Sequence, residues 1–251
     1  MNIGILTSTS ISEFRLATLQ KILEDEEFSI KVAFVDTRKQ SFKDKLLKNI
    51  KRGRGGYILI MALEKIFSKK GSSSSISTKE FCQKNKIDYI ATSNPYNLKD
   101  IEKLKKYNLD VLLLVGGYGI IKEPLLSLAK EGILSYHHGD MRKYRGMPPA
   151  FWELYNNEKT MGVTLQKLSK ELDAGWPIVE KSVEIYKNDT LETLEKRARE
   201  ESVDMMYEAL KKIKNKEPIK KLDKLGKVYT LPNLREWLIF KIKMMLRKSR
   251  G

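Results

Sequence analysis

The sequence of 251 residues has one cysteine, two histidines and no long apolar run. A single cysteine, Cys82, excludes an internal disulfide, and no cluster of cysteine and histidine offers a structural zinc site. The longest apolar candidate, residues 57–67, is shorter than the ~18 residues that a membrane span needs. The opening residues MNIGILTSTS lack the basic segment and cleavage site of a signal peptide. These absences predict a cytoplasmic protein without a metal.

Positive charge is present in excess. Lysine and arginine number 48 against 32 acidic residues, which gives a formal net charge of +16. Such a balance favours anionic partners: nucleic acid, phosphorylated metabolites or a membrane surface. The lysines are spread along the whole chain, so a generally lysine-rich surface is favoured over a nucleic-acid footprint.

Apolar and amphipathic segments alternate along most of the chain, which is typical of an α/β fold with a mostly parallel sheet flanked by helices. We expect the buried strand LDVLLLVGG near the centre of the sheet. Two helices broken at GRGG are expected within residues 39–75, with GSSSS as an exposed loop. The expected strands are 2–8, 29–36, 88–93, 109–117, 133–138, 162–168 and 176–186, and the other expected helices are 12–26, 77–87, 97–108, 122–132, 149–158 and 190–216.

The last part of the chain lies outside this alternation. We expect residues 1–215 to form one catalytic domain and residues 216–251 to form a short basic tail. The tail ends in a basic amphipathic helix with Trp237, Leu238, Ile242 and Met245. Such a helix either makes peripheral contact with a membrane surface or docks on its own domain or a dimer partner, and docking is favoured.

Both histidines lie in the stretch SYHHGDMRKYRG, residues 135–146, at the end of a predicted strand. Ligands bind at the carboxyl ends of strands in open α/β sheets. Neighbouring side chains on a strand point to opposite faces, so His137 and His138 have different roles. A histidine at such a place, taken alone, is more often structural than catalytic.

Two further features are weak when each is taken alone. Asp173 lies in LDAG, which is also a common turn sequence. The segment VGGYGII follows a buried strand, and its glycines let the backbone approach a flat ligand closely. It is not a dinucleotide fingerprint, because G-x-G-x-x-G is absent.

Together the three features resemble the formyltransferases that use 10-formyltetrahydrofolate, a family that includes enzymes acting on methionyl-tRNA, glycinamide ribonucleotide and amino sugars. The family pattern Asn-x-His, Arg-Gly-x-x-Pro, Gly-Val-Thr and Leu-Asp-x-Gly reads here as SYH, RGMPP, GVT and LDAG. The 36 positions between His137 and Asp173 match the family spacing without a gap. The resemblance extends to about residue 215, is strongest over 109–180, and implies a Rossmann-like formyltransferase fold.

The resemblance implies catalytic roles for three residues and requires no metal. His137 would donate to the oxyanion, Asp173 would relay protons through water, and Ser135 replaces the asparagine of the family with a shorter donor. It also implies a pocket for 10-formyltetrahydrofolate, the co-substrate, between two loops. The residues of this pocket are Tyr118, Gly119, Ile120 and Ile121 in the first loop and Ser169, Lys170, Glu171 and Leu172 in the second.

The acceptor is open at this stage. An amino sugar nucleotide is favoured. About 35 residues after the long helix are too few for the second domain usual in methionyl-tRNA formyltransferases, so tRNA is a disfavoured alternative that the positive charge keeps open. The absence of the Ser-Leu-Leu-Pro loop typical of the family weakens glycinamide ribonucleotide as acceptor. Because Ser135 replaces the asparagine of the family, two alternatives to a transferase stay open: a formyltetrahydrofolate hydrolase, or a non-catalytic folate-fold binding protein. Arg142, Lys143 and Arg145 either steer a phosphate or form a solvated loop face. The sequence does not indicate an oligomeric state.

Overall fold

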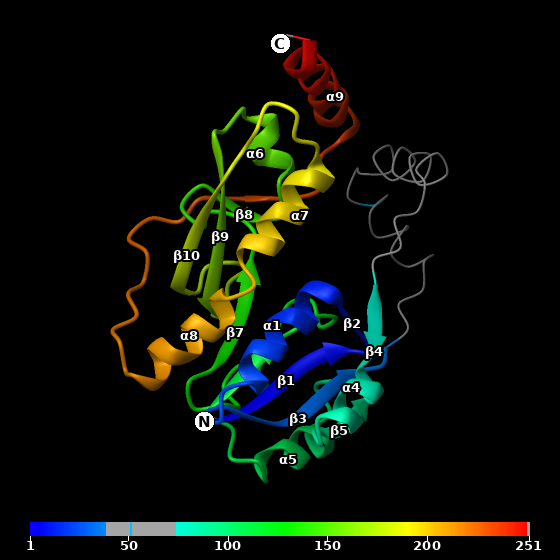
Figure 1. Cartoon of the computed structure of the whole chain (residues 1–251), viewed down its shortest axis with the longest axis vertical. Helices are drawn as coiled ribbons and strands as arrows, with labels where there is room; N and C mark the ends of the chain where they lie inside the picture. The colour runs from blue at the N-terminus through cyan, green and yellow to red at the C-terminus, as the bar shows by residue number, and fades with distance from the viewer. Residues whose placement is uncertain (39–50, 52–73, 250–251) are drawn as a thin grey trace.

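A seven-stranded sheet runs through the computed structural model, which describes residues 1–38, 51 and 74–249 (Figure 1). Its strands follow the order β10-β9-β7-β6-β1-β3-β5. Five neighbouring strands are parallel, and β9 runs antiparallel to both β7 and β10. The bounds are β1 Asn2–Ser8, β3 Ser29–Asp36, β5 Asp88–Thr92, β6 Val111–Leu114, β7 Ile133–His137, β9 Thr160–Lys167 and β10 Trp176–Glu184. The predicted α/β architecture is confirmed.

Strand β6 stands in the middle of this order, as its unbroken apolar sequence predicts. Leu112 and Leu113 are fully buried but face opposite sides: Leu113 joins one hydrophobic cluster and Leu112 the other. Burying a leucine side chain contributes ~1.5–3 kcal/mol. A strand that is apolar at every position is therefore stable only where both faces of the sheet are covered.

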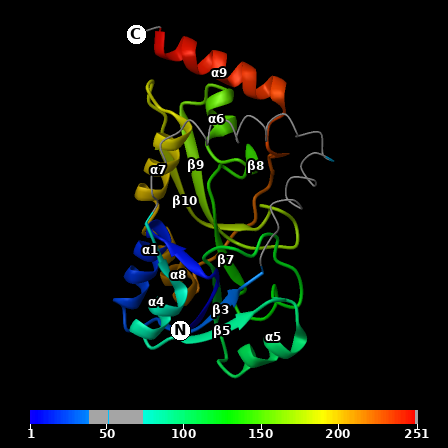
Figure 2. The same ribbon diagram turned by 90° about the vertical axis from the view of Figure 1, so that its right-hand side faces the viewer.

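Helices cover the two faces unequally. One hydrophobic cluster contains residues of α1, α4, α7 and α8, whereas the other contains residues of α5 and of the turns after β6 (Figures 1 and 2). The bounds are α1 Glu13–Leu23, α4 Thr78–Lys84, α5 Leu98–Lys105, α6 Phe151–Tyr155, α7 Leu191–Glu201, α8 Met205–Lys214 and α9 Leu234–Ser249. No helix in these described segments is long and apolar enough to cross a membrane.

The helix expected at 122–132 is wrong: the segment forms successive turns. Its apolar residues, Leu125 and Ala129, are buried as a helix would bury them. However, Lys130 N donates to Leu109 O and Glu131 N to Asp110 O. These backbone bonds tie the segment to the start of β6 and replace helical ones.

The single helix expected at 190–216 is two helices, α7 and α8. The hydroxyl of Tyr136, on β7, donates to Ser202 O at 2.8 Å and accepts from Met206 N at 3.2 Å. The Tyr136 hydroxyl thus satisfies backbone groups that become free where the helix is interrupted between α7 and α8. The local sequence does not predict this tertiary contact.

Two small strand pairs were not expected from the sequence. One joins β2 (Ser10–Ser12) to β4 (Ser75–Ser77), so Ser75 is in a strand and not in the predicted loop. The other joins β8 (Tyr144–Gly146) to β11 (Lys227–Tyr229). The two helices expected within 39–75 lie outside the described residues.

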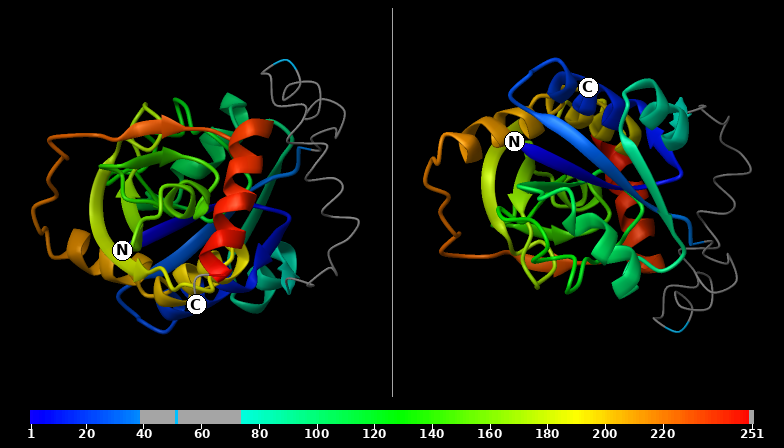
Figure 3. Two further views of the ribbon diagram at one scale, coloured as in Figure 1. Left: turned by 90° about the horizontal axis from the view of Figure 1, so that it is seen from above. Right: turned by 90° about the horizontal axis from the view of Figure 1, so that it is seen from below.

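Residues 216–249 return across the molecule after α8. β11 pairs in parallel with β8, and α9 then packs on α6 at the end of the molecule (Figures 2 and 3). The contact is aromatic: the rings of Phe151 and Phe240 lie 4.6 Å apart between centroids. The predicted terminal helix is present, and one of its faces docks on the body of the chain.

Candidate active site

The last residue of β7, His137, meets Asp173 across the carboxyl end of the sheet. His137 is 6% exposed, and its Nδ1 lies 3.4 Å from Asp173 Oδ2. Its Nε2 lies 2.7 Å from Tyr144 O. The structure therefore brings together the two residues that the ungapped spacing of 36 positions selects.

His138 lies on the other side of β7, as the alternation of strand side chains predicts. Its ring centroid is 5.9 Å from those of Phe14 and Tyr136. Its Nε2 is buried without a hydrogen-bond partner in the described part of the chain. The two histidines thus occupy different environments.

The carboxylate of Asp173 contacts residues of three strands. Its Oδ2 accepts from Gly146 N of β8 at 2.8 Å, and its Oδ1 accepts from Gln166 Nε2 of β9 at 3.2 Å. Counting His137 of β7, three of the ~four lone-pair positions of a carboxylate are in use. One position remains for a water molecule or a substrate group.

Both ring nitrogens of His137 face oxygen atoms that can accept hydrogen bonds. Tyr144 O can only accept, so Nε2 donates to it. Asp173 already accepts from two N–H groups, so its carboxylate is held as an acceptor. A lone pair on Nδ1 would face that carboxylate unfavourably, whereas an Nδ1–H group would be attracted to it.

Gln166 is a residue that the sequence reasoning missed. It lies opposite Ser135 in the antiparallel register of β7 and β9, just as Thr164 lies opposite His137. Its amide group donates to Asp173 and its Oε1 accepts from Gly175 N at 3.1 Å. Period-two alternation from the threonine of GVT places Gln166 on the face of the histidine, so this signal was available.

The second missed contribution comes from the tail. β11 lies against β8, and Tyr229 O accepts from Met147 N at 3.2 Å. Trp152 Nε1 donates to Thr230 O at 3.1 Å. The tail therefore supports β8, the short strand whose Gly146 N donates to Asp173.

Ser135 does not join the pair. It is buried, and its hydroxyl lies 3.4 Å from Tyr136 O, a long hydrogen bond. The contacts described for its side chain include neither His137 nor Asp173. Its place two residues before His137 still puts it on the same face of β7.

The two loops expected to bind folate have exposed apolar side chains. Ile120 is 59% and Leu172 is 41% exposed. Tyr118 points inward instead: it is buried, and its hydroxyl donates to Phe34 O at 2.6 Å. Its side chain is therefore structural. Ile121 is buried in a cluster against which Leu168, next to the second loop, also packs.

The cations of the 139–146 loop have partners within the chain. Arg142 Nη2 lies 3.0 Å from Glu180 Oε2, and Lys143 Nζ lies 3.0 Å from Glu158 Oε2. Arg145 donates to carbonyl groups of the Asp173 turn, Leu172 O at 2.7 Å and Asp173 O at 3.0 Å. Arg145 thus clamps the Asp173 turn and does not point outward for a phosphate.

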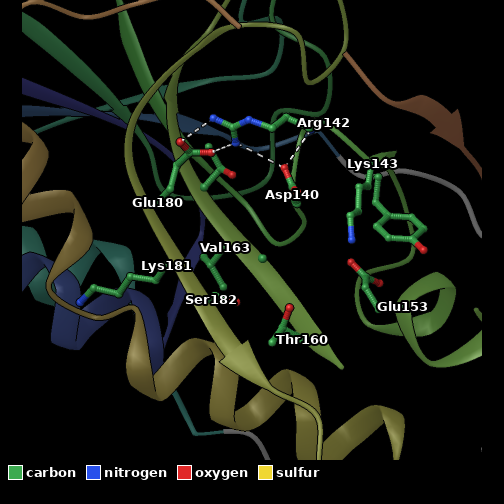
Figure 4. A pocket seen from close by; sticks show the side chains of 12 residues that line it. Asp140, Arg142, Lys143, Glu153, Thr160, Val163, Glu180, Lys181 and Ser182 are labelled. Carbon is green, nitrogen blue, oxygen red and sulfur yellow. Dashed lines mark hydrogen bonds and ion pairs between the residues drawn. The ribbon is translucent and has the colours of Figure 1, made fainter. Parts of the chain in front are cut away.

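A cavity of about 260 Å³ is lined by residues of this loop, Asp140, Arg142 and Lys143, and by residues of β9 and β10 (Figure 4). It shares Tyr144 and Thr164 with the surroundings of His137 but is not lined by His137 or Asp173. Burial raises the pKa of Glu153, in its wall, to about 7. No group of three His, Cys, Asp or Glu in the described segments is arranged to hold a metal ion.

A second polar cluster lies beside His138. Burial, together with the charges of Arg15 and Arg199, lowers the pKa of His138 to about 3. Arg15 donates to Leu114 O, at the carboxyl end of β6, while Arg199 pairs with Glu195. Since an unfolded histidine titrates near 6.5, this site makes the fold less stable as the pH falls from there towards 3.

Comparison with known proteins identifies the family. The sequence profile described as formyl transferase matches residues 14–210. The chain belongs to the formyl transferase family. The profile ends before β11 and α9, so the tail contact with β8 lies outside the matched region.

Curated relatives that match the chain include methionyl-tRNA formyltransferases. A methionyl-tRNA formyltransferase of Thermotoga neapolitana is 42% identical over 118 residues, which are 47% of this chain and 37% of that protein. A second methionyl-tRNA formyltransferase, of Caldicellulosiruptor saccharolyticus, is 26% identical over 83% of this chain and 59% of its own length. The chain therefore spans less than two thirds of these curated relatives.

Solved structures share the formyl transferase fold at low identity. Glycinamide ribonucleotide transformylase 1 from Symbiobacterium toebii has a TM-score of 0.62 at 18% identity, covering 91% of this chain and 94% of that chain. An N-formyltransferase from Helicobacter canadensis, in complex with folinic acid and dTDP-3-aminofucose, has a TM-score of 0.61 at 16% identity, covering 100% and 83%.

The Gly146→Ala variant tests whether the tail positions the site. Gly146 has φ +90°, and a Cβ there would lie 2.1 Å from Tyr229 O. We expect β11 to be displaced and Gly146 N to move away from Asp173. Besides the ~1–2 kcal/mol typical for alanine at positive φ, the variant should lose further stability in urea unfolding and amide-exchange protection in β8.

Gly119→Ala is the matched control. Gly119 also has a positive φ, +67°, but a Cβ there meets no atom within 4 Å. Equal losses of unfolding free energy in the two variants would show that the contact of Tyr229 with Gly146 does not hold the strand.

Proposed function

We propose that the protein transfers a formyl group from 10-formyltetrahydrofolate to a primary amine, and that the amine belongs to an amino sugar linked to a nucleotide. The observation that supports this most is the contact of His137 Nδ1 with Asp173 Oδ2 at the carboxyl end of β7. Membership of the formyl transferase family gives the reaction class.

The reaction requires a donor for negative charge. Attack of the amine nitrogen on the formyl carbon forms a carbon–nitrogen bond and places a negative charge on the formyl oxygen. A preorganised donor is worth ~3–4 kcal/mol in such a step. His137 takes this role in the proposal: Nε2 is bound to Tyr144 O, and Nδ1, whose contact with Asp173 is long at 3.4 Å, donates to the oxyanion beside Asp173.

The reaction also requires proton movement. The attacking nitrogen loses a proton, and the folate nitrogen gains one as the second carbon–nitrogen bond breaks. Asp173 retains one free acceptor position, and its side chain is 17% exposed. It can therefore bind the water that relays this proton, while Gly146 N and Gln166 keep the carboxylate in place.

Ser135 serves as a secondary group in this proposal. Its single long hydrogen bond leaves the hydroxyl able to rotate towards the histidine face. A serine reaches less far than the asparagine of the family pattern, so a water molecule between Ser135 and the oxyanion completes the donor set.

The folate pocket is proposed between residues 118–121 and 169–172. Ile120 and Leu172 supply exposed apolar surface suited to a flat ring. Backbone groups of Gly119 and its neighbours supply hydrogen bonds, because the positive φ of Gly119 turns the chain there. Lys170 and Glu171 are exposed beside Leu172 and contribute through their backbone in this proposal.

The cluster of Arg15, Arg199 and His138 favours an acceptor that carries phosphate. Burial and repulsion by Arg199 lower the pKa of Arg15, and burial and repulsion by both arginines lower the pKa of His138. Glu195 is the carboxylate partner of Arg199. An anion there would offset this repulsion. A nucleotide sugar has such a group next to its amine-bearing ring. We further propose that residues 1–215 form the catalytic domain and that residues 216–251 support its site.

An acceptor screen tests the proposed function. The full chain is incubated with 10-formyltetrahydrofolate and, separately, aminated nucleotide sugars, glycinamide ribonucleotide and methionyl-tRNA. We expect tetrahydrofolate to form only with an amine present, fastest with a nucleotide sugar. Release without acceptor would identify a hydrolase, and folate binding without turnover for any acceptor would contradict formyl transfer.

Arg15→Gln tests the acceptor site within that screen. Losing one charge-assisted contact to phosphate typically weakens binding by about tenfold or more. We expect a corresponding rise in acceptor KM with kcat little changed. Arg235→Gln, which removes an exposed arginine on α9, is the matched control.

A titration of His138 by NMR gives an independent readout. Binding of a nucleoside diphosphate should raise the pKa of His138, because the anion offsets the charges of Arg15 and Arg199. If Arg15→Gln instead lowers kcat and the melting temperature together, the residue is a structural support of Leu114 O and not an acceptor contact.

A further inference from the structure

Helix α9 crosses one end of the molecule, and one of its faces is fixed to the body (Figures 1 and 2). Phe240 is buried against Phe151. Lys243 Nζ donates to Tyr155 O at 2.6 Å, and Arg247 Nη2 donates to Tyr186 O at 2.9 Å. The helix is thus held firmly, and its opposite face points away from the chain.

That opposite face is apolar. Its side chains recur every three or four residues, so they form one stripe along the helix. Of the eleven large hydrophobic side chains that are exposed in the described part of the chain, five are on α9 and Tyr186 lies beside it. The stripe consists of Leu234 (44% exposed), Leu238 (49%), Ile242 (53%) and Met245 (64%), with Leu246 (51%) at its edge.

The helix that carries the stripe is basic. The sequence of α9 has five basic residues and one acidic residue. The partners of Lys243 and Arg247 are neutral carbonyl groups of the body, so these two cations lie on the side of the helix that faces the chain. Lys159 and Lys187 are exposed in the loops that flank β9 and β10.

We propose that this end of the molecule, the stripe of α9 with its flanking cations, docks on the surface of an anionic lipid bilayer. An apolar helical stripe bordered by lysine and arginine is the composition of helices that lie in the bilayer interface. Each basic residue near an anionic leaflet adds to the attraction.

Charge also argues against a second copy on this face. The chain carries +16, and two α9 helices would bring their basic borders together. Like charges at close range oppose association. A protruding helix of 16 residues, about 24 Å long at 1.5 Å per residue, instead suits a broad flat surface.

Co-sedimentation with vesicles tests the proposal. The full chain is mixed with vesicles of phosphatidylcholine alone and of equal parts phosphatidylcholine and phosphatidylglycerol, at low and high salt. We expect binding to the anionic vesicles that weakens severalfold at high salt. No binding to anionic vesicles would overturn the proposal and leave an acidic protein as the partner to seek.

Matched variants identify the face. Leu238→Ser with Ile242→Ser keeps the charge and should lower the partition onto anionic vesicles by about tenfold or more, because two buried aliphatic chains are lost. Leu98→Ser is the control: Leu98 is 70% exposed, but on α5 at the other end of the molecule. Unchanged binding of the double variant would mean adsorption through the basic surface at large.

Two measurements without lipid exclude other occupants. We expect the parent and the double variant to have the same mass by sedimentation velocity and melting temperatures within about a degree or two, as surface changes have. A dimer that the double variant dissociates would assign the face to a second copy. A melting temperature several degrees lower in the double variant would show that the chain itself covers the stripe. Either result overturns the lipid proposal.

Discussion

The rest of the site depends on the hydrogen bonds and the ionic contact that the carboxylate of Asp173 makes. It joins β7 through His137, β8 through Gly146 N and β9 through Gln166. Asp173 lies in a turn at φ +43°, which Arg145 stabilises by donating to Leu172 O and Asp173 O. A histidine at the end of a parallel strand becomes part of a polar pair only because the turn between β9 and β10 brings Asp173 against it.

The tail adds a further strand, β11, beside β8 of this site. Tyr229 lies so close to Gly146 that only glycine fits there, and Trp152 binds the chain just after β11. The same tail then carries α9, which packs on α6. Support of the site and presentation of an apolar helix are thus properties of one continuous segment that follows the matched family region.

Much of the fold and of the site could be predicted from the sequence. The parts that could not be predicted depend on contacts between residues far apart in the chain or on ambiguous apolar spacing. Apolar strands predict the sheet, and the resemblance to the formyltransferases, with its ungapped spacing of 36 positions, implies the pairing of His137 with Asp173. Gln166 follows from alternation along β9. The break between α7 and α8 depends on the hydroxyl of Tyr136, and β11 pairs with a three-residue strand about 80 positions earlier. Neither contact produces a recognisable pattern in the neighbouring sequence. The turns at 122–132 have apolar spacing that a helix would also satisfy.

We propose that His137 and Asp173 act as one unit in formyl transfer. This proposal is tested most directly by a double-mutant cycle on kcat/KM with His137→Ala, Asp173→Asn and the combination, at a fixed acceptor. Residues that act together have losses that do not add, so we predict that the double variant is little slower than the slower single variant. Losses that multiply, or a single variant that keeps most of the parent activity, would contradict the account.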